Sequence, residues 1–213
     1  GSNVFNPALT GRAFLFLSFP AAMGAMWLEP KSIMPVDAIS SATTLSHLKA
    51  GTFVFEDNTL LQFFLGNRAG CIGETSILLI LISFIFLSVT RIIDWRAPFA
   101  MVITVFAGTF LANLGDGLSA ASLQGLFSLM TGGVAFGATF MVTDYATAPV
   151  TKKGRLVFGF GCGLITFLIR EFGGYPEGVM FSILVMNSIV PFLNNLTSRM
   201  YGYAKTKKQG RKS

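Results

Sequence analysis

Long apolar runs separated by short polar breaks dominate the hydropathy pattern of the chain. A helix that crosses a hydrocarbon layer of roughly 30 Å needs about 20 mostly apolar residues. By this measure the pattern predicts an all-α polytopic membrane protein, with a single transmembrane domain over residues 1–204 and a tail over 205–213. The six predicted spans cover residues 11–28, 74–93, 97–114, 119–142, 155–172 and 177–197.

The polar linker over residues 29–73 is too long for a plain connection between two spans. Within it, Asp57-Asn58 can cap a helix, "LLQFFL" supplies an apolar face, and Gly66-Asn67 can end the helix. We therefore expect a short helix here, lying in the membrane interface.

The run "MTGGVAFGATFMVTDYATAP", residues 130–149, differs from the other spans. Paired glycines and a following Pro149 predict a broken helix, whose freed backbone groups can line a ligand or ion site. A carboxylate near membrane depth is a candidate for ion coupling, which makes Asp144 the candidate here. The alternative is that Asp144 only caps a turn.

Two GxxxG patterns, Gly133–Gly137 and Gly159–Gly163, allow helices to approach closely. Packing within one bundle explains them as well as a dedicated dimer face would.

Composition supports the membrane interpretation. The chain is 52% hydrophobic and 12% charged, with a mean hydropathy of +0.63, which excludes an ordinary soluble domain. The net charge of +6 does not indicate nucleic-acid binding, because much of it lies in the tail "KTKKQGRKS". Cys71 and Cys162 have no metal-ligand spacing, and the sole histidine, His47, falls in the polar linker.

Lysines and arginines in the loops predict the orientation. The 91–96 loop, the 143–155 loop and the C-terminal tail are basic, so we expect them on the cytoplasmic side of a prokaryotic inner membrane. Arg12 then starts the first span from the inner side. The same count places the beginning of the second span, with Thr75, on the outer face.

A polar cluster, "CIGETS", immediately precedes that second span. Gly73 allows a positive φ, Thr75 and Ser76 are good N-cap residues, and Glu74 suits the positive end of a helix dipole. A helix N-terminus also binds phosphate. The residues alone leave two interpretations open: a simple cap or a phosphate site.

Four segments together resemble the RnfD/NqrB family of membrane electron-transfer subunits, and its RnfD branch most. They are "NVFNPALTGRAFLFLSFP", "CIGETS", "GATFMVTD" and "IREFGGYPEGVMFSILVMNSIVPFLN", in this order over essentially the whole chain. Members of that family are expected to have about ten spans in two halves. The resemblance therefore implies that this chain corresponds to the second half, without the N-terminal spans.

The resemblance implies covalent FMN, joined through its phosphate to Thr75 by a flavin transferase, with Gly73, Glu74 and Ser76 around it. Two other threonines compete for the attachment. Thr139 lies inside an apolar span, out of reach of an external enzyme, and Thr43 lies in a loop with no helix start behind it.

The resemblance also implies non-covalent riboflavin at Asn3 and Asn6, whose amides suit the edge of a flavin ring. The alternative is that Asn6-Pro7 only starts the first helix. Arg170 matches the family pattern too and could attract a flavin phosphate or act as an interfacial anchor.

The implied function is that of a membrane subunit of an Rnf-type ferredoxin:NAD oxidoreductase, coupled to Na⁺ or H⁺ translocation, with no catalytic side chains of its own. Its implied partners are RnfG, RnfA, RnfE, RnfC and membrane lipid. The alternatives are an NqrB-like quinone-reducing subunit and a non-redox secondary transporter. Polar residues near membrane depth fit the transporter: Asn113, Asp144 and Asn187.

Overall fold

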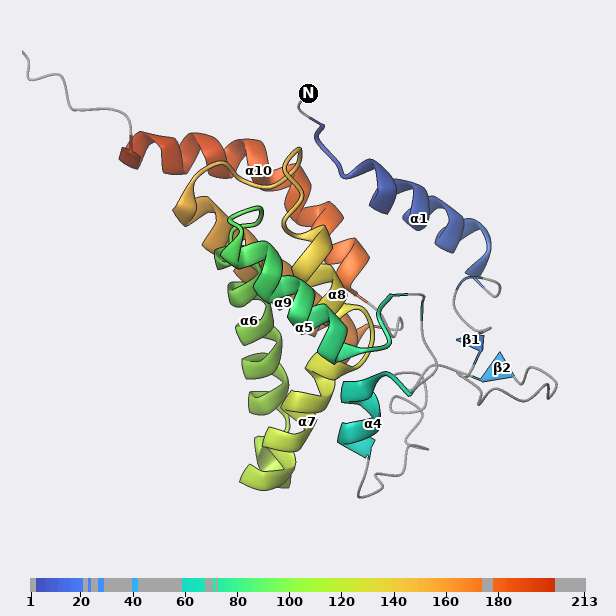
Figure 1. The fold of residues 1–213 in the computed structure, drawn as a ribbon. Helices are drawn as coiled ribbons and strands as arrows, with labels where there is room; N and C mark the ends of the chain where they lie inside the picture. Colours follow the sequence, from blue (N-terminus) through green and yellow to red (C-terminus); the bar gives the residue numbers. More distant parts are fainter. Residues whose placement is uncertain are drawn as a thin grey trace, which may run out of the picture.

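The computed structural model describes residues 3–20, 23, 27–28, 40–41, 59–67, 71, 73–173 and 178–201. The predicted cap at 57–58, Thr43, His47 and the basic tail at 205–213 lie outside the described residues. The helical elements are α1 (Pro7–Ser18), α4 (Thr59–Leu65), α5 (Ile77–Val89), α6 (Arg96–Ala112), η1 (Leu114–Asp116), α7 (Leu118–Met130), α8 (Val134–Phe136), η2 (Gly137–Met141), α9 (Lys152–Phe172) and α10 (Val179–Tyr201) (Figure 1).

Helices follow the predicted apolar runs closely, and the described part of the chain is helical apart from one small strand pair. Strand β1 (Trp27–Leu28) pairs antiparallel with β2 (Ser40–Ser41) inside the long linker, which hydropathy did not predict. The short helix predicted in the linker is confirmed as α4, and Gly66 ends it with a φ of +104°. A left-handed C-terminal residue of this kind is a common helix stop.

Glycines hold α9 against α6. A Cβ on Gly159 would clash with the carbonyl oxygen of Ala97, and one on Gly163 would lie 2.7 Å from that of Met101. The second GxxxG pattern therefore serves packing within the bundle, where two backbones approach closely. The buried core gathers around this seam and includes Met101, Val105, Phe158 and Cys162.

The broken helix is confirmed. Helix α7 ends at Met130, where Thr131 is extended and Gly132 has a φ of +60°, and the chain continues as α8 and the π-helical segment η2. The two halves are bent by 62°. Gly137 lets η2 lie against Val179 of α10. The break therefore redirects the chain into the middle of the bundle.

By length and composition, one described helix is long and apolar enough to cross a membrane, the Val179–Thr197 part of α10. The bent pair Leu118–Met130 and Val134–Met141 passes the same test when taken together, and α5 and α6 are apolar but shorter. These observations are consistent with a membrane protein, whereas the six-span topology stays a prediction.

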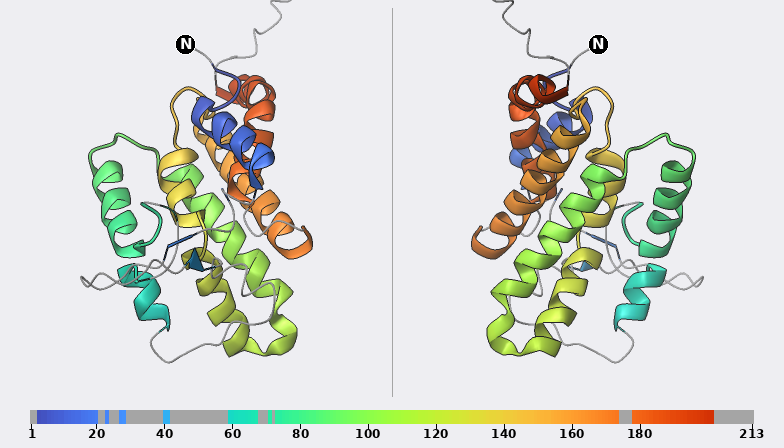
Figure 2. Two further views of the ribbon diagram at one scale, coloured as in Figure 1. Left: turned by 90° about the vertical axis from the view of Figure 1, so that its right-hand side faces the viewer. Right: turned by 90° about the vertical axis from the view of Figure 1, so that its left-hand side faces the viewer.

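Helices α4 and α5 stand to one side of the other helices (Figure 2). Among the residues of α5, only Ile80 is buried, at 5% exposed. On the opposite side α1 lies along α10, where Phe16 meets Phe181 edge to face at 6.1 Å. The bundle thus has one tightly packed side and one loosely packed side.

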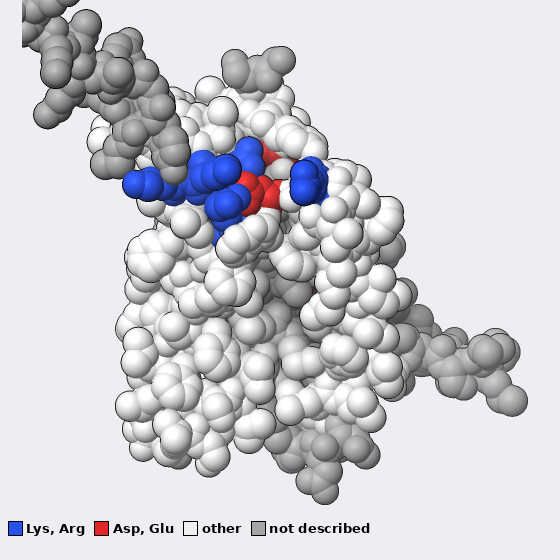
Figure 3. Space-filling view, turned by 60° about the vertical axis from the view of Figure 1, so that its left-hand side comes forward, with Lys and Arg blue, Asp and Glu red and all other residues white. Residues whose placement is uncertain are grey.

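Charged side chains gather in a band near one end of the molecule, and the surface below the band is uncharged in that view (Figure 3). There the two predicted cytoplasmic loops meet, because Arg155 Nη1 donates to Asp94 Oδ2 at 2.7 Å. Tyr145 also donates its hydroxyl to the carbonyl of Ile92. The prediction that these loops share one side is confirmed, while the side of the membrane that they face stays a prediction.

Candidate functional site

The turn that precedes α5 is folded tightly on itself. Glu74 N–H donates to the carbonyl of Cys71 at 3.2 Å, and Cys71 N–H donates to Glu74 Oε1 at 3.3 Å. Gly73 has a φ of +90°, a conformation that suits glycine. The Glu74 side chain is consequently buried, at 7% exposed, whereas Thr75 next to it is half-buried.

Ser76, and not Thr75, caps the helix. Its Oγ accepts a hydrogen bond from Leu79 N–H at 3.4 Å, and α5 begins at the following residue, Ile77. Both residues are good capping types, and only the structure decides between them. Modification of the Thr75 hydroxyl would therefore leave the cap intact.

Two other helices press against this turn. A Cβ on Gly66, at the end of α4, would lie 2.8 Å from Ser76 Cβ. From α1, Arg12 Nη2 lies 3.6 Å from Cys71 Sγ. Sequence reasoning treated Arg12 only as the inner end of the first span, because nothing local connects it with a turn that lies so much later in the chain. The structure makes it a cation beside the turn.

Arg170 has a different role from either of the predicted ones. Its Nη1 donates to the carbonyl of Ser128 at 2.7 Å and its Nη2 to that of Thr131 at 3.1 Å. These are carbonyls at the C-terminus of α7, where a helix leaves acceptors unpaired and favours positive charge. Arg170 thus caps the broken helix at its break.

The competing threonine Thr139 is buried, at 4% exposed, within η2. Its carbonyl accepts a hydrogen bond from the Thr143 hydroxyl at 2.7 Å. This burial agrees with the sequence argument that Thr139 is out of reach of an external modifying enzyme.

Asn6 joins the start of α1 to Asp144. Its Oδ1 accepts from Ala8 N–H at 3.0 Å and from Leu9 N–H at 3.3 Å, which is the capping role foreseen as the alternative to flavin contact. Its Nδ2 donates to Asp144 Oδ2 at 3.3 Å, and Thr147 donates to the same oxygen at 2.8 Å. Both candidates therefore have structural contacts, while Asn3 is exposed.

A polar hollow of about 850 Å³ opens at the charged end, and Asp144 lines it. Asp94 lies in its wall and receives hydrogen bonds from both Arg96 and Arg155. Burial opposes ionisation of Asp94, but hydrogen bonds from the Arg96 N–H and from the two guanidinium groups outweigh it and lower the pKa of Asp94 below its ordinary value. Sequence reasoning did not single out Asp94, because its partners come from distant segments.

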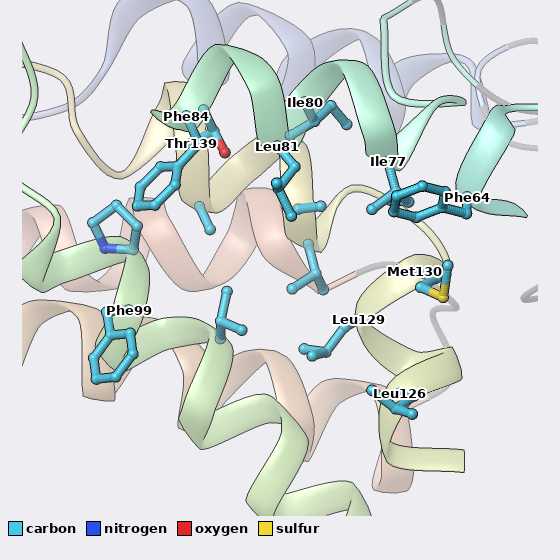
Figure 4. Close-up of a pocket in the computed structure, with 15 residues that line it drawn as sticks. Phe64, Ile77, Ile80, Leu81, Phe84, Phe99, Leu126, Leu129, Met130 and Thr139 are labelled. Atoms are coloured by element: carbon cyan, nitrogen blue, oxygen red, sulfur yellow. The ribbon is translucent and has the colours of Figure 1, made fainter. Parts of the chain in front are cut away.

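An apolar groove of about 420 Å³ runs between α5 and the bundle. Apolar side chains from α5, such as Ile77 and Leu81, face others from α6 and α7, such as Phe99 and Leu129 (Figure 4). Thr139 is the one side chain with a hydroxyl in its lining. The groove fits an apolar chain or ring and offers almost nothing to a polar ligand.

Asn187 of α10 is fully buried, and neither polar atom of its side chain has a hydrogen-bond partner within the described residues. Pro191, four residues later in the same helix, has no N–H to give to the Asn187 carbonyl. Polar groups left without partners in an apolar interior are costly. This residue belonged to the predicted transporter alternative.

Comparison with known proteins gives a consistent result. Residues 1–202 match the model of the NQR2, RnfD, RnfE family. The chain is 40% identical to a subunit of the Na⁺-translocating ferredoxin:NAD⁺ oxidoreductase complex of Acetobacterium woodii, over 99% of this chain and 63% of that protein.

Two further relatives have related names, and both correspond to the same subunit of their complexes. The protein from the proton-translocating ferredoxin:NAD⁺ oxidoreductase complex of Clostridium ljungdahlii is 40% identical over 92% of this chain and 60% of its own length. The protein from the ion-translocating oxidoreductase complex of Stutzerimonas stutzeri is 39% identical over 95% of this chain and 64% of its own. The chain thus spans less than two thirds of the length of these relatives.

Proposed function

Because the chain belongs to the NQR2, RnfD, RnfE family, we propose that it forms the corresponding part of the RnfD subunit in an Rnf-type ferredoxin:NAD oxidoreductase complex. In this role it relays electrons within the membrane, coupled to Na⁺ or H⁺ translocation. The observation that carries the proposal is 40% identity over 99% of the chain to a protein of such a complex.

The proposal includes covalent FMN on Thr75. The geometry of the turn supports this residue because the neighbouring side chains already have local roles: Glu74 is turned inward, and Ser76 caps α5. The first N–H groups of a helix favour a phosphate, and so does a cation such as Arg12 beside the turn. A phosphoester at Thr75 fits this arrangement.

When bound, the flavin would supply the electron-carrying chemistry. The chain supplies position and insulation. Gly73 and the Cys71–Glu74 hydrogen bonds fix the turn, and α4 holds it from one side through Gly66. Apolar residues such as Phe64 and Ile77, beside the turn, exclude water from its surroundings.

The broader assembly follows from the same proposal. The chain sits in the prokaryotic cell membrane as a multi-pass protein, with its C-terminus in the cytoplasm and Thr75 outside. RnfG is its electron-transfer partner, among companions that include RnfA, RnfE and RnfC, and a flavin transferase completes it. Non-covalent riboflavin at Asn3 and Asn6 remains part of the proposal, although Asn6 already uses its oxygen and one N–H within the chain.

Flavin attachment is tested by in-gel ultraviolet fluorescence of the denatured protein from the purified complex. We expect the fluorescent band in the wild type and in Thr139→Val, and none in Thr75→Val. Ser76→Ala is the matched control: it should keep the fluorescence while destabilising α5 by about 1 kcal/mol. Persistent fluorescence in Thr75→Val, or its loss in Thr139→Val, would contradict the assignment.

The redox function is tested separately with membrane vesicles that contain the whole complex. Ferredoxin-dependent reduction of NAD should fall to the background level in Thr75→Val while the assembled complex remains present. Activity with quinone in place of NAD would instead support the NqrB-like alternative. A complex that carries no flavin on this chain and still moves ions would support the transporter.

A further inference from the structure

The polar hollow and the apolar groove form the two halves of one surface, because the same elements line both. On α5, Phe84 lines the groove and Ser88, one turn later, lines the hollow. On α6 the change falls between Ala97 in the hollow and Pro98 in the groove. From η2 onward it falls between Thr139 and Val142, so a ligand that fills both must be amphiphilic.

The hollow is cationic. Its lining contains two carboxylates and four basic side chains: Asp94, Asp144, Arg91, Arg96, Lys152 and Arg155. Asp94 pairs with Arg96 and Arg155. Arg91 and Lys152 are exposed, and neither forms an ion pair in the described part of the chain. Two positive charges therefore remain available to an anion.

Both available cations stand where local structure disfavours them. Arg91 follows the end of α5 with a φ of +57°, and the hydrogen bonds from Arg91 N–H to Ser88 O and from Ile92 N–H to Leu87 O are those of a helix stop that normally uses glycine. The left-handed conformation costs a side chain roughly 1 kcal/mol. Lys152 is the first residue of α9, where the helix dipole repels a positive charge. Neither placement is explained by stability of the fold.

Trp95 marks the junction between the two halves. It is 49% exposed, its ring meets Phe99 of the groove edge to face at 5.6 Å, and the Arg96 guanidinium lies 5.3 Å from the ring centre. Tryptophan is the residue typical of the level where lipid headgroups meet acyl chains.

We propose that this surface binds one anionic phospholipid, with its phosphate between Arg91 and Lys152 and an acyl chain in the groove below. The cations recognise the charge of the head, and the groove, almost without polar lining, recognises the tail. The site needs a membrane, but it needs neither flavin nor electron transfer. Helix α5 then gains through lipid the packing that the protein does not supply.

The test uses the complete complex in lipid nanodiscs, labelled with a phosphatidylglycerol that carries a photoreactive group on one acyl chain. We expect cross-links on peptides from α5, α6 or η2, competed by unlabelled phosphatidylglycerol. Phosphatidylcholine of the same chain length, glycerol phosphate and quinone should compete at least about tenfold less well, as expected without charge-assisted contacts or without a tail.

Matched variants assign the two halves. Arg91→Gly, which suits the backbone, combined with Lys152→Gln should lower labelling about tenfold, whereas Lys153→Gln, a charge loss next to the hollow lining, should not. Ala135→Phe should fill the groove and abolish labelling, and Ala112→Phe, on exposed α6 surface, should not.

Labelling that is unchanged in both the charge and the groove variants would overturn the proposal. Equal competition by phosphatidylcholine or quinone would overturn an anionic lipid as the ligand. Equal competition by glycerol phosphate would show a site for free phosphate instead. Thermal unfolding of each variant complex separates loss of the site from loss of the fold.

Discussion

Helices α9 and α5 present opposite solutions to the same problem of packing an apolar helix. Helix α9 brings its backbone against α6 at Gly159 and Gly163 and buries Phe158 and Cys162. Helix α5 is a nearly uninterrupted apolar run, yet only Ile80 of its residues is buried. Apolar composition thus does not decide packing here. Small residues at the contact do, and the helix without them borders both the groove and the threonine turn.

The largest expected effect comes from the tight side. Gly159→Leu should destabilise the protein by roughly 3 kcal/mol, because the new side chain would displace the Ala97 backbone. The measurement is thermal unfolding of the purified complex. Gly11→Ala is the control, since a Cβ there meets nothing within 4 Å and alanine favours the helix. Equal stability of the two variants would mean that α6 and α9 are not in close contact.

Asp94→Asn tests the charged end, where the two sides join. Removing the charge that receives Arg96 and Arg155 should cost about 2 kcal/mol. Because the pKa of Asp94 in the fold is below its ordinary value of 3.8, its ionised form stabilises the fold above that pH. This contribution is lost as the pH falls through the lower folded value. The wild type should therefore lose stability on acidification below about pH 4, and Asp94→Asn should lose less.

Gly73→Ala tests the loose side. The φ of +90° penalises any side chain, and the new Cβ would meet Phe136 at an ordinary contact distance of 3.4 Å. Strain alone should therefore cost about 1 to 2 kcal/mol, and it should reduce flavin attachment because the turn loses its shape. Fluorescence of the denatured protein measures the attachment. Full attachment in Gly73→Ala would show that the turn is reshaped by the modifying enzyme in any case.

The smallest effect is expected at Asn187, the polar exception within the tight side. Asn187→Leu should leave stability unchanged or raise it by about 1 kcal/mol, because a buried amide without partners is replaced by apolar contacts. A loss of stability would instead reveal a partner for the amide in the complete protein. Ion transport measured on the same variant shows whether the unpaired amide serves translocation.

The sequence was sufficient for much of the helical framework. Apolar runs located the helices to within a few residues, and Gly66 was identified as the stop of α4. It also anticipated the break near Gly132, because paired glycines cannot sustain a regular helix there. It did not anticipate the strand pair in the linker, whose two residues per strand leave too short a pattern to detect.

The candidate site divides in the same way. The types and order of residues in "CIGETS" singled out the turn and its threonine, because capping, positive φ and helix dipoles are local effects. Which hydroxyl caps the helix, the approach of Arg12 and the use of Arg170 on the end of α7 were decided only by the tertiary structure. Those contacts join residues far apart in the chain, and their geometry depends on how α5 stands away from the glycine-packed helices. Local chemistry depends on neighbouring residues, whereas the meeting of distant charges is set by packing.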